Sequence, residues 1–343
     1  MGSERPLILF AEASAADLEH YEQLKASATL VQSEQPISDG AVSFSEEELA
    51  KAEVLSVMVH SKVDRPLMDR MPNLRLIATR STGFDHIDRL EAKDRGIAIA
   101  YVPEYGTDTV AEYTFALLLN LTRQSHKAYV RSLTGEFNFA GLMGTDLCGK
   151  TLGVIGLGRI GQKVARIAHG FDMNVVAFDP VVLRKSTDGL AAKLASLDEV
   201  LAGSDALAIC CPLNESTHHL LSDREFGLMR QGVYLVNTAR GAVLNTAALL
   251  SAIQTGTVAA AALDVLEEEG SVSEEAALSE LVGHQLGSLH TLACNLALLR
   301  HPNVLVTPHM AYFSKEAVER IHRTTAANIH GFIGGVPTNI VQA

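Results

Sequence analysis

Gly156, Gly158 and Gly161 carry the most informative chemistry of the chain, because glycines at the spacing G-x-G-x-x-G can cradle a phosphate. The first glycine permits a tight turn, the second lets backbone approach a pyrophosphate, and the third lets a helix pack closely on a strand. The helix that follows presents unpaired N–H groups and a partial positive charge to the phosphates. The spacing predicts a dinucleotide site with Arg159 and Ile160 on its phosphate turn.

An acidic residue follows at a distance that suits a carboxylate bound to ribose. Residues 162–170 have helical spacing, and residues 173–178 have the composition of a buried strand that ends at Asp179. A carboxylate there accepts hydrogen bonds from the ribose hydroxyls of NAD and repels the 2′-phosphate of NADP. Arg184 and Lys185, slightly further on, leave NADP as an alternative. The pattern favours NAD.

The elements that must position these residues follow an alternating pattern of short apolar runs and helical stretches, which predicts an α/β protein with parallel sheets. The expected strands are residues 7–10, 54–59, 74–79, 97–102, 206–210, 234–237, 259–263 and 304–307. Residues 15–26 are expected to form one helix. Residues 271–300 are rich in Leu and Ala and are also expected to be helical.

Residues 107–123 form an expected helix of a different kind, because it is apolar on most of its faces. Asp108 or Thr109 can cap its start. Such a helix is buried between domains, at a subunit contact, or in the core of one domain, and the sequence leaves these alternatives open.

Composition narrows the class of protein. The chain has 343 residues, 47% hydrophobic and 20% charged, which is typical of a soluble globular protein of two domains. Its net charge of −12 argues against nucleic acid or an anionic membrane as a partner. The N-terminal apolar stretch is too short for a signal peptide, and no run approaches a membrane span. The cysteines lack a framework spacing and are Cys148, Cys210, Cys211 and Cys294. We expect a cytoplasmic protein.

Besides the glycine turn, the chain contains several further motifs. They are Arg80-Ser-Thr-Gly-Phe-Asp-His-Ile-Asp88, Val102-Pro-Glu-Tyr105, Thr109-Val-Ala-Glu-Tyr113, Cys211-Pro-Leu-Asn-Glu-Ser-Thr217, Val236-Asn-Thr-Ala-Arg-Gly241, Leu263-Asp-Val-Leu-Glu-Glu-Glu269 and Asn303-Val-Leu-Val-Thr-Pro-His309. In this order they resemble the D-isomer-specific 2-hydroxyacid dehydrogenase family, especially its NAD-dependent D-lactate dehydrogenases. The resemblance runs from about residue 54 to about residue 332.

The resemblance implies a catalytic set of His309, Glu269 and Arg240. Imidazole titrates near neutrality and suits a proton donor, although a His after Thr-Pro can equally lie in a surface loop. A carboxylate beside it favours imidazolium, and Glu267 or Glu268 can take that role if the loop is shifted. The fork of donors on Arg240 can hold a substrate carboxylate, whereas the alternative is a surface arginine after a strand.

The resemblance also implies residues around substrate and cofactor. Backbone donors of Thr82 and Gly83 are expected to face the substrate. Tyr105 and Tyr312 are expected either to line its pocket or to pack at the domain cleft. The expected cofactor-binding residues are Gly156, Gly158, Arg159, Ile160, Gly161, Asp179, Cys211, Pro212, Thr217, Thr238, Ala239 and Asp264. No metal is expected, because the adjacent His218 and His219 have no carboxylate at ligand spacing in the sequence and suit a surface helix start.

The expected architecture is a Rossmann cofactor domain inserted into a flavodoxin-like substrate domain. Its boundaries give a substrate domain of residues 1–105 and 307–343 and a cofactor domain of residues 106–306. We expect a homodimer that reversibly reduces pyruvate to D-lactate with NADH. Hydroxypyruvate or glyoxylate is the alternative substrate, and an NAD-sensing, corepressor-like binding protein is the alternative class. Turnover of pyruvate with NADH separates the enzyme from the sensor.

Overall fold

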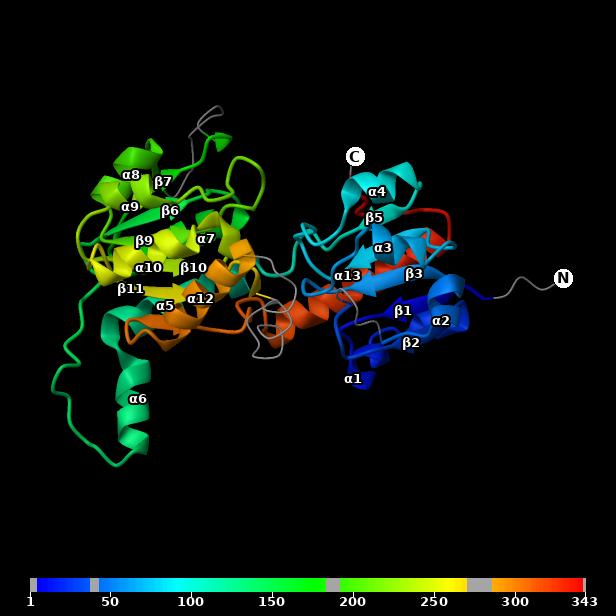
Figure 1. Ribbon diagram of the computed structural model, residues 1–343, viewed down its shortest axis with the longest axis horizontal. Helices are drawn as coiled ribbons and strands as arrows, with labels where there is room; N and C mark the ends of the chain where they lie inside the picture. Colours follow the sequence, from blue (N-terminus) through cyan, green and yellow to red (C-terminus); the bar gives the residue numbers. More distant parts are fainter. Residues whose placement is uncertain (1–4, 38–42, 183–191, 270–285, 342–343) are drawn as a thin grey trace. The chain divides into compact units, whose positions relative to one another are not determined.

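The computed structural model describes residues 5–37, 43–182, 192–269 and 286–341. The chain divides into a terminal unit, Met1–Tyr105 with Ser314–Ala343, and a central unit, Gly106–Phe313 (Figure 1). The second boundary therefore lies after residue 313, whereas the sequence placed it after residue 306. The reason is that hydrogen bonds to Asp264 tie the intervening segment to the central unit.

The terminal unit contains a five-stranded parallel sheet in the order β2-β1-β3-β4-β5, which is the order of flavodoxin-like folds. Its strands are β1 (Leu7–Phe10), β2 (Thr29–Gln32), β3 (Ala52–Val57), β4 (Leu76–Thr79) and β5 (Ala98–Ala100). Its helices are α1 (Ala15–Glu19), α2 (Glu46–Lys51), α3 (Arg65–Asp69), α4 (Arg89–Asp94) and α13 (Lys315–Ile333). Two apolar clusters form its core.

The single helix expected over residues 15–26 is interrupted. The structure has α1 and then a short 3₁₀ helix, Glu22–Ala26. Between them lies Tyr21, which is fully buried and whose hydroxyl lies 2.9 Å from Nδ1 of His322 on α13. This distant contact overrides the local helical pattern.

The central unit contains a seven-stranded parallel sheet in the order β12-β11-β10-β9-β6-β7-β8. The order reverses between β6 and β9, as in Rossmann folds, which bind their ligands at that point. The strands are β6 (Thr151–Ile155), β7 (Asn174–Phe178), β8 (Lys193–Leu194), β9 (Ala206–Ile209), β10 (Val233–Asn237), β11 (Val258–Leu263) and β12 (Val304–Val306). Long runs of buried Val, Leu, Ile and Ala explain why these segments form a sheet covered on both faces.

Helices cover both faces of this sheet (Figure 1). They are α5 (Thr107–Arg123), α7 (Arg159–Gly170), α8 (Leu197–Gly203), α9 (Asp223–Leu228), α10 (Thr246–Gln254) and α12 (Leu286–Arg300), with a 3₁₀ turn at Gly241–Val243. Helix α6 (Ser125–Leu133) follows α5 and buries none of its residues. Helix α5 has the expected bounds, but it begins after Gly106 without a side-chain cap from Asp108 or Thr109. Of the expected helix 271–300, residues 271–285 lie outside the described residues. No helix in the described ranges is long and apolar enough to cross a membrane.

Candidate active site

The glycine turn joins β6 to α7 and leaves an open space beside it. At Gly156, φ is +94° and a Cβ atom would lie 2.6 Å from the backbone nitrogen of Cys211. At Gly161, a Cβ would lie 2.0 Å from the carbonyl oxygen of Gly156, so only glycine lets the helix approach the strand. At Gly158, by contrast, a Cβ would meet no described atom within 4 Å. The cradle therefore has room where a pyrophosphate approaches.

The start of α7 suits an anion. Gly158 is its N-cap residue, and no side chain accepts a hydrogen bond from the first amides. Those amides and the helix dipole favour a phosphate there. Arg159 and Ile160 form the first turn, and Arg159 is exposed.

Asp179 lies at the end of β7, next to the glycine turn. One carboxylate oxygen accepts a hydrogen bond from the amide of Leu157 at 2.8 Å, and the other accepts from Val181 and Val182. The oxygen bound to Leu157 has only this one donor among the described hydrogen bonds, so its second lone pair can accept from a ribose hydroxyl. The structure thus fixes the carboxylate beside the turn. Arg184 and Lys185 lie outside the described residues.

The segment after β9 carries the next expected cofactor residues. Thr217 Oγ1 donates to the carbonyl oxygen of Pro212 at 2.6 Å and closes a compact turn. Burial raises the pKa of Cys210 to about 12 and that of Cys211 to about 11. Neither thiol is therefore a ready nucleophile.

The end of β10 presents Thr238, Ala239 and Arg240 in a turn held by Asn237. The side chain of Asn237 is fully buried, accepts from the amide of Ala239 at 3.0 Å and donates to the carbonyl of Arg240 at 2.9 Å. Thr238 Oγ1 lies 3.0 Å from Thr114 Oγ1 on α5. Asn237 lies within the motif of residues 236–241, but no role was predicted for it. Its position gave a signal for such a role, because a polar residue at the end of an apolar strand often holds the following turn.

Asp264, which follows β11, holds the loop that carries His309. Its carboxylate accepts hydrogen bonds from Thr307 Oγ1 at 2.6 Å and from the amides of Met310 and Ala311 at 3.0 and 2.8 Å. Burial raises the pKa of this carboxyl, although these hydrogen bonds and His309 oppose the shift. In this structure the carboxylate of Asp264 holds the loop that leads to His309.

His309 adopts a left-handed backbone conformation with φ +48°. Its amide donates to the carbonyl oxygens of Asp264 and Thr307, both at 2.9 Å. Such a conformation is uncommon for residues other than glycine and occurs where the surroundings enforce it. Here the hydrogen bonds to Asp264 hold the loop in which His309 follows β12.

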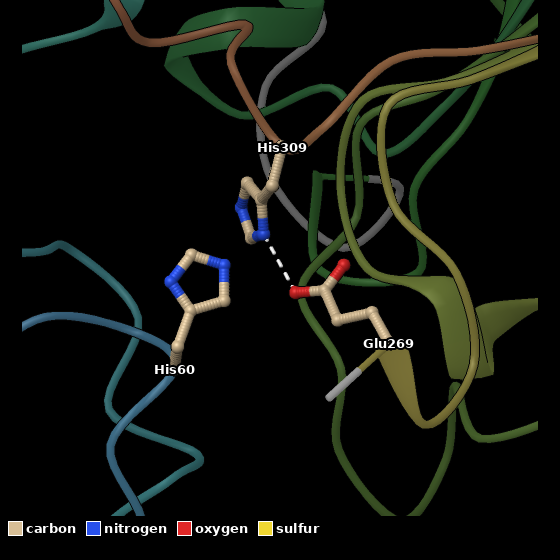
Figure 2. A group of neighbouring side chains, drawn as sticks. All are labelled: His60, Glu269 and His309. Carbon is tan, nitrogen blue, oxygen red and sulfur yellow. Dashed lines mark hydrogen bonds and ion pairs between the residues drawn. The ribbon is translucent and has the colours of Figure 1, made fainter. Parts of the chain in front are cut away.

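Glu269 and His309 meet directly. Glu269 Oε1 lies 2.7 Å from His309 Nδ1, and Figure 2 shows this hydrogen bond. The other oxygen of Glu269 accepts from the amide of Leu266 at 3.3 Å. Of the three consecutive glutamates, Glu269 is thus the one bound to His309, while Glu267 points to His219. A carboxylate on Nδ1 orients the ring and leaves Nε2 for proton transfer.

In the terminal unit, Thr82 and Gly83 lie in the turn after β4. Thr82 Oγ1 donates to the carbonyl oxygen of Val102 at 2.8 Å. Ser81 Oγ donates to the carbonyl oxygen of Gly83 at 2.6 Å. The turn is therefore held by its own side chains, and Thr82 is exposed.

The two expected tyrosines belong to different units. Tyr105 ends the first segment of the terminal unit, where its carbonyl oxygen accepts from Arg320 Nε at 2.8 Å. Tyr312 belongs to the central unit, and its ring packs edge-on against Phe313 with centroids 6.0 Å apart. Both side chains are partly buried.

His218 and His219 lie in a turn rather than at the expected helix start, and the fold supplies the carboxylate that the local sequence lacks. One ligand atom each of His218, His219 and Glu267 lies within 4.8 Å of the others. Two imidazoles and a carboxylate are ligands that Zn²⁺ accepts. A nitrogen that carries a proton cannot bind a metal ion, so the position of the proton on His219 decides between a metal and a hydrogen bond.

Asn245, the N-cap residue of α10, determines the position of this proton. Asn245 Oδ1 accepts from the amide of Ala248 at 3.0 Å, so its Nδ2 faces Nδ1 of His219 at 3.4 Å. His219 Nδ1 must accept there, which puts the proton on Nε2, where it is donated to Glu267 at 2.6 Å. A metal ion on Nε2 would move that proton toward the amide hydrogens of Asn245. The arrangement favours a hydrogen bond over a metal.

Known proteins share both the motifs and the fold. The family model described as D-isomer specific 2-hydroxyacid dehydrogenase, NAD binding domain, matches residues 115–311. The chain is 36% identical to 2-hydroxyacid dehydrogenase A of Aspergillus oryzae, over 82% of this chain and 79% of that protein. It is 33% identical to a glyoxylate reductase of Thermococcus litoralis, over 86% and 85%. D-lactate dehydrogenase of Aquifex aeolicus, solved with NAD and lactic acid, superposes with a TM-score of 0.83 at 34% identity, over 96% of each chain.

These matches agree with the parallel sheets, the glycine turn and the bonded carboxylate and imidazole. The open space at Gly158 and the uncapped start of α7 fit a bound NAD. The chain belongs to the D-isomer-specific 2-hydroxyacid dehydrogenases, oxidoreductases with an NAD-binding domain.

Proposed function

We propose that this enzyme reduces pyruvate to D-lactate, reversibly, with NADH. The observation that carries the proposal is the hydrogen bond between Glu269 and His309 at the ends of two neighbouring strands, β11 and β12. The likeness to the D-lactate dehydrogenase of Aquifex aeolicus supports pyruvate in particular.

In this mechanism the cradle of Gly156, Gly158 and Gly161 holds the pyrophosphate and Asp179 accepts from the ribose. Bound NADH supplies the hydride for the keto carbon. His309 holds a proton on Nε2 and donates it to the keto oxygen, while Glu269 stabilises the imidazolium through Nδ1. Arg240 binds the substrate carboxylate with its guanidinium. Thr82, Gly83, Tyr105 and Tyr312 are the proposed substrate-binding residues.

A panel of keto acids tests the substrate. We expect kcat/KM with NADH to be highest for pyruvate among pyruvate, glyoxylate, hydroxypyruvate and a longer keto acid, and the product to react with a D-specific lactate assay. A higher value for glyoxylate would favour the second candidate, which the likeness to a glyoxylate reductase supports. Tight NADH binding without turnover of any keto acid would indicate an NAD-sensing protein.

The variant His309→Ala tests the proton donor. We expect kcat to fall by about 10³-fold, because general acid catalysis is lost, while NADH still binds. The matched control is His330→Ala on α13, an exposed histidine in the terminal unit. Full activity of His309→Ala would contradict the assignment.

We also propose that two copies of the chain pair through α6 and the segment after it, and that the protein works in the cytoplasm. Figure 1 shows α6 projecting from the rest of the central unit. Large apolar side chains on it and after it are exposed, among them Leu133 at 68%, Phe137 at 96% and Met143 at 91%. A surface of this kind favours a protein partner. Light scattering of the purified chain should give the mass of a dimer.

The cysteines support the proposed cytoplasmic location. All four are free, as in a reducing compartment.

A further inference from the structure

The three glutamates that follow β11 have separate surroundings. Glu269 binds His309, and Glu268 is exposed with φ +52°. Glu267 has a different histidine as its partner: Nε2 of His219 lies 2.6 Å from Oε1 of Glu267. The Glu267 side chain is only 12% exposed, so this contact is largely shielded from water. The proposed catalytic mechanism leaves Glu267 and His219 without a role.

Glu267 is held from several elements of the central unit. Its Oε2 accepts from Thr246 Oγ1 at 2.7 Å, at the start of α10. Its backbone carbonyl accepts from Nδ2 of Asn295 on α12 at 2.7 Å, and Asn295 is 1% exposed. Burial opposes the charged form, but the hydrogen bonds from Thr246 and His219 outweigh it and lower the pKa of Glu267. Glu267 is therefore an ionised acceptor with two side-chain donors.

The backbone next to Glu267 is packed closely against Gly241. A Cβ atom at Gly241 would lie 2.0 Å from the carbonyl carbon of Leu266 and 2.2 Å from the amide nitrogen of Glu267. The peptide between Leu266 and Glu267 thus rests directly on Gly241, which follows the proposed substrate anchor Arg240.

Leu266, the first residue of this peptide, is linked to Glu269 through its own amide. That amide donates to Oε2 of Glu269 at 3.3 Å, while Oε1 of the same carboxylate binds His309. A displacement of Leu266 therefore moves a donor of Glu269. The bonded tautomer of His219, fixed by Asn245, makes His219 a donor to Glu267.

We propose that His219 and Glu267 form a positioning pair, which holds the loop of residues 265–269 so that Glu269 stays in hydrogen-bond contact with His309. Neither residue touches the reacting atoms. The inference rests on the proposed roles of Glu269 and His309 and adds two residues that act through them.

The test uses variants that break the pair. His219→Asn removes the imidazole but tolerates the left-handed backbone at this position, where φ is +49°. Glu267→Ala removes the acceptor. For both we expect kcat of pyruvate reduction to fall by about 10-fold, because a small displacement of a catalytic group has a large effect, while KM for NADH stays within about 2-fold. Glu267→Gln, which keeps an oxygen in place, should recover most of kcat.

A matched control is His218→Asn, because His218 lies beside His219 without a hydrogen bond to Glu267 among the described contacts. Its kcat should stay at the wild-type value. Thermal unfolding and NADH titration of each variant show that the central unit is folded. If His219→Asn fails to fold, the comparison of Glu267→Ala with Glu267→Gln decides the question.

A double variant separates positioning from a merely structural effect. If the pair acts through Glu269, His219→Asn combined with Glu269→Gln loses no more kcat than Glu269→Gln alone. Multiplied losses, or an unchanged kcat in both His219→Asn and Glu267→Ala, would overturn the positioning role. Failure of the proposed function looks different, since the wild type would then reduce no keto acid or His309→Ala would remain active.

Discussion

In the terminal unit, the first four helices each begin at a side chain that accepts a hydrogen bond from their own amides. The caps are Ser14 for α1, Ser45 for α2, Asp64 for α3 and Asp88 for α4. In the central unit, α7 begins at Gly158 with no such side chain and with open space beside it. Both kinds of helix follow strands of parallel sheets. They differ in whether a side chain of the protein accepts hydrogen bonds from the first amides of the helix.

Arg80 and Glu12 of the terminal unit are also satisfied by partners within that unit. Arg80 is 2% exposed and donates to the carbonyl oxygens of Ala11 and Glu12 at 2.5 and 2.7 Å. The carboxylate of Glu12 accepts from the amides of Met58 and Ser61. A unit that satisfies its own donors gains stability, whereas amides left unsatisfied at α7 are available to a ligand.

The largest effect is expected when α7 is given the kind of cap found in the terminal unit. Gly158→Asp places a carboxylate where the pyrophosphate is expected, and the extended backbone there (φ −70°, ψ −163°) accepts a side chain. We expect NADH to bind at least about 100-fold more weakly, about 2.7 kcal/mol, while the protein stays folded. Fluorescence titration with NADH and a thermal unfolding curve measure both.

Gly158→Ala is the matched control, since it adds a Cβ without a charge and should weaken NADH binding far less. An unchanged NADH affinity in Gly158→Asp would mean that the open start of α7 is not the phosphate site.

An intermediate effect is expected from the buried His322 of the terminal unit. Burial and the neighbouring His20 lower its pKa to about 4, against the opposing pull of Asp17. The folded state therefore binds fewer protons than the unfolded chain, whose histidine titrates near 6.5. The free energy of unfolding should fall as pH drops from 6.5 to about 4, by roughly 2 kcal/mol from this residue.

Urea unfolding at pH 7 and pH 4.5 measures this loss. His322→Gln should remove that part of the pH dependence. An equal decline in wild type and variant would show that other groups cause it.

The smallest effect is expected from removing a cap in the terminal unit. Asp88→Ala deletes the acceptor for the amide of Glu91 and should lower the free energy of unfolding by about 1 kcal/mol. NADH affinity should stay within about 2-fold. A loss of NADH affinity comparable to that of Gly158→Asp would erase the distinction between the two kinds of helix start.

Most strands were predictable because they are apolar runs between turn residues. The prediction for residues 7–10 has the bounds of β1, and the others differ by one or two residues at their ends. Strands β2 and β8 were not predicted. Thr29–Gln32 contains polar ends, and Lys193–Leu194 has only two residues, so backbone pairing with β1 and β7 defines them rather than composition.

The site was predictable where motifs carry the chemistry and not where distant contacts set the geometry. The glycine spacing predicted the turn because Gly156 and Gly161 each meet a local steric demand. The choice of Glu269 over Glu267 came from the resemblance, since three identical neighbours give no local signal. The partners of Glu267 are Thr246, His219 and Asn295, each brought to it by folding.

The left-handed backbone at His309 has a consequence for how this position can change. Valine, isoleucine and threonine are strongly disfavoured at φ +48°, whereas asparagine, aspartate and glycine tolerate it. The backbone conformation thus restricts which residues can replace His309 in a folded protein. The residues that the backbone accepts most readily are poor proton donors near neutral pH, so under the proposed mechanism drift at this site gives folded proteins without the proton donor.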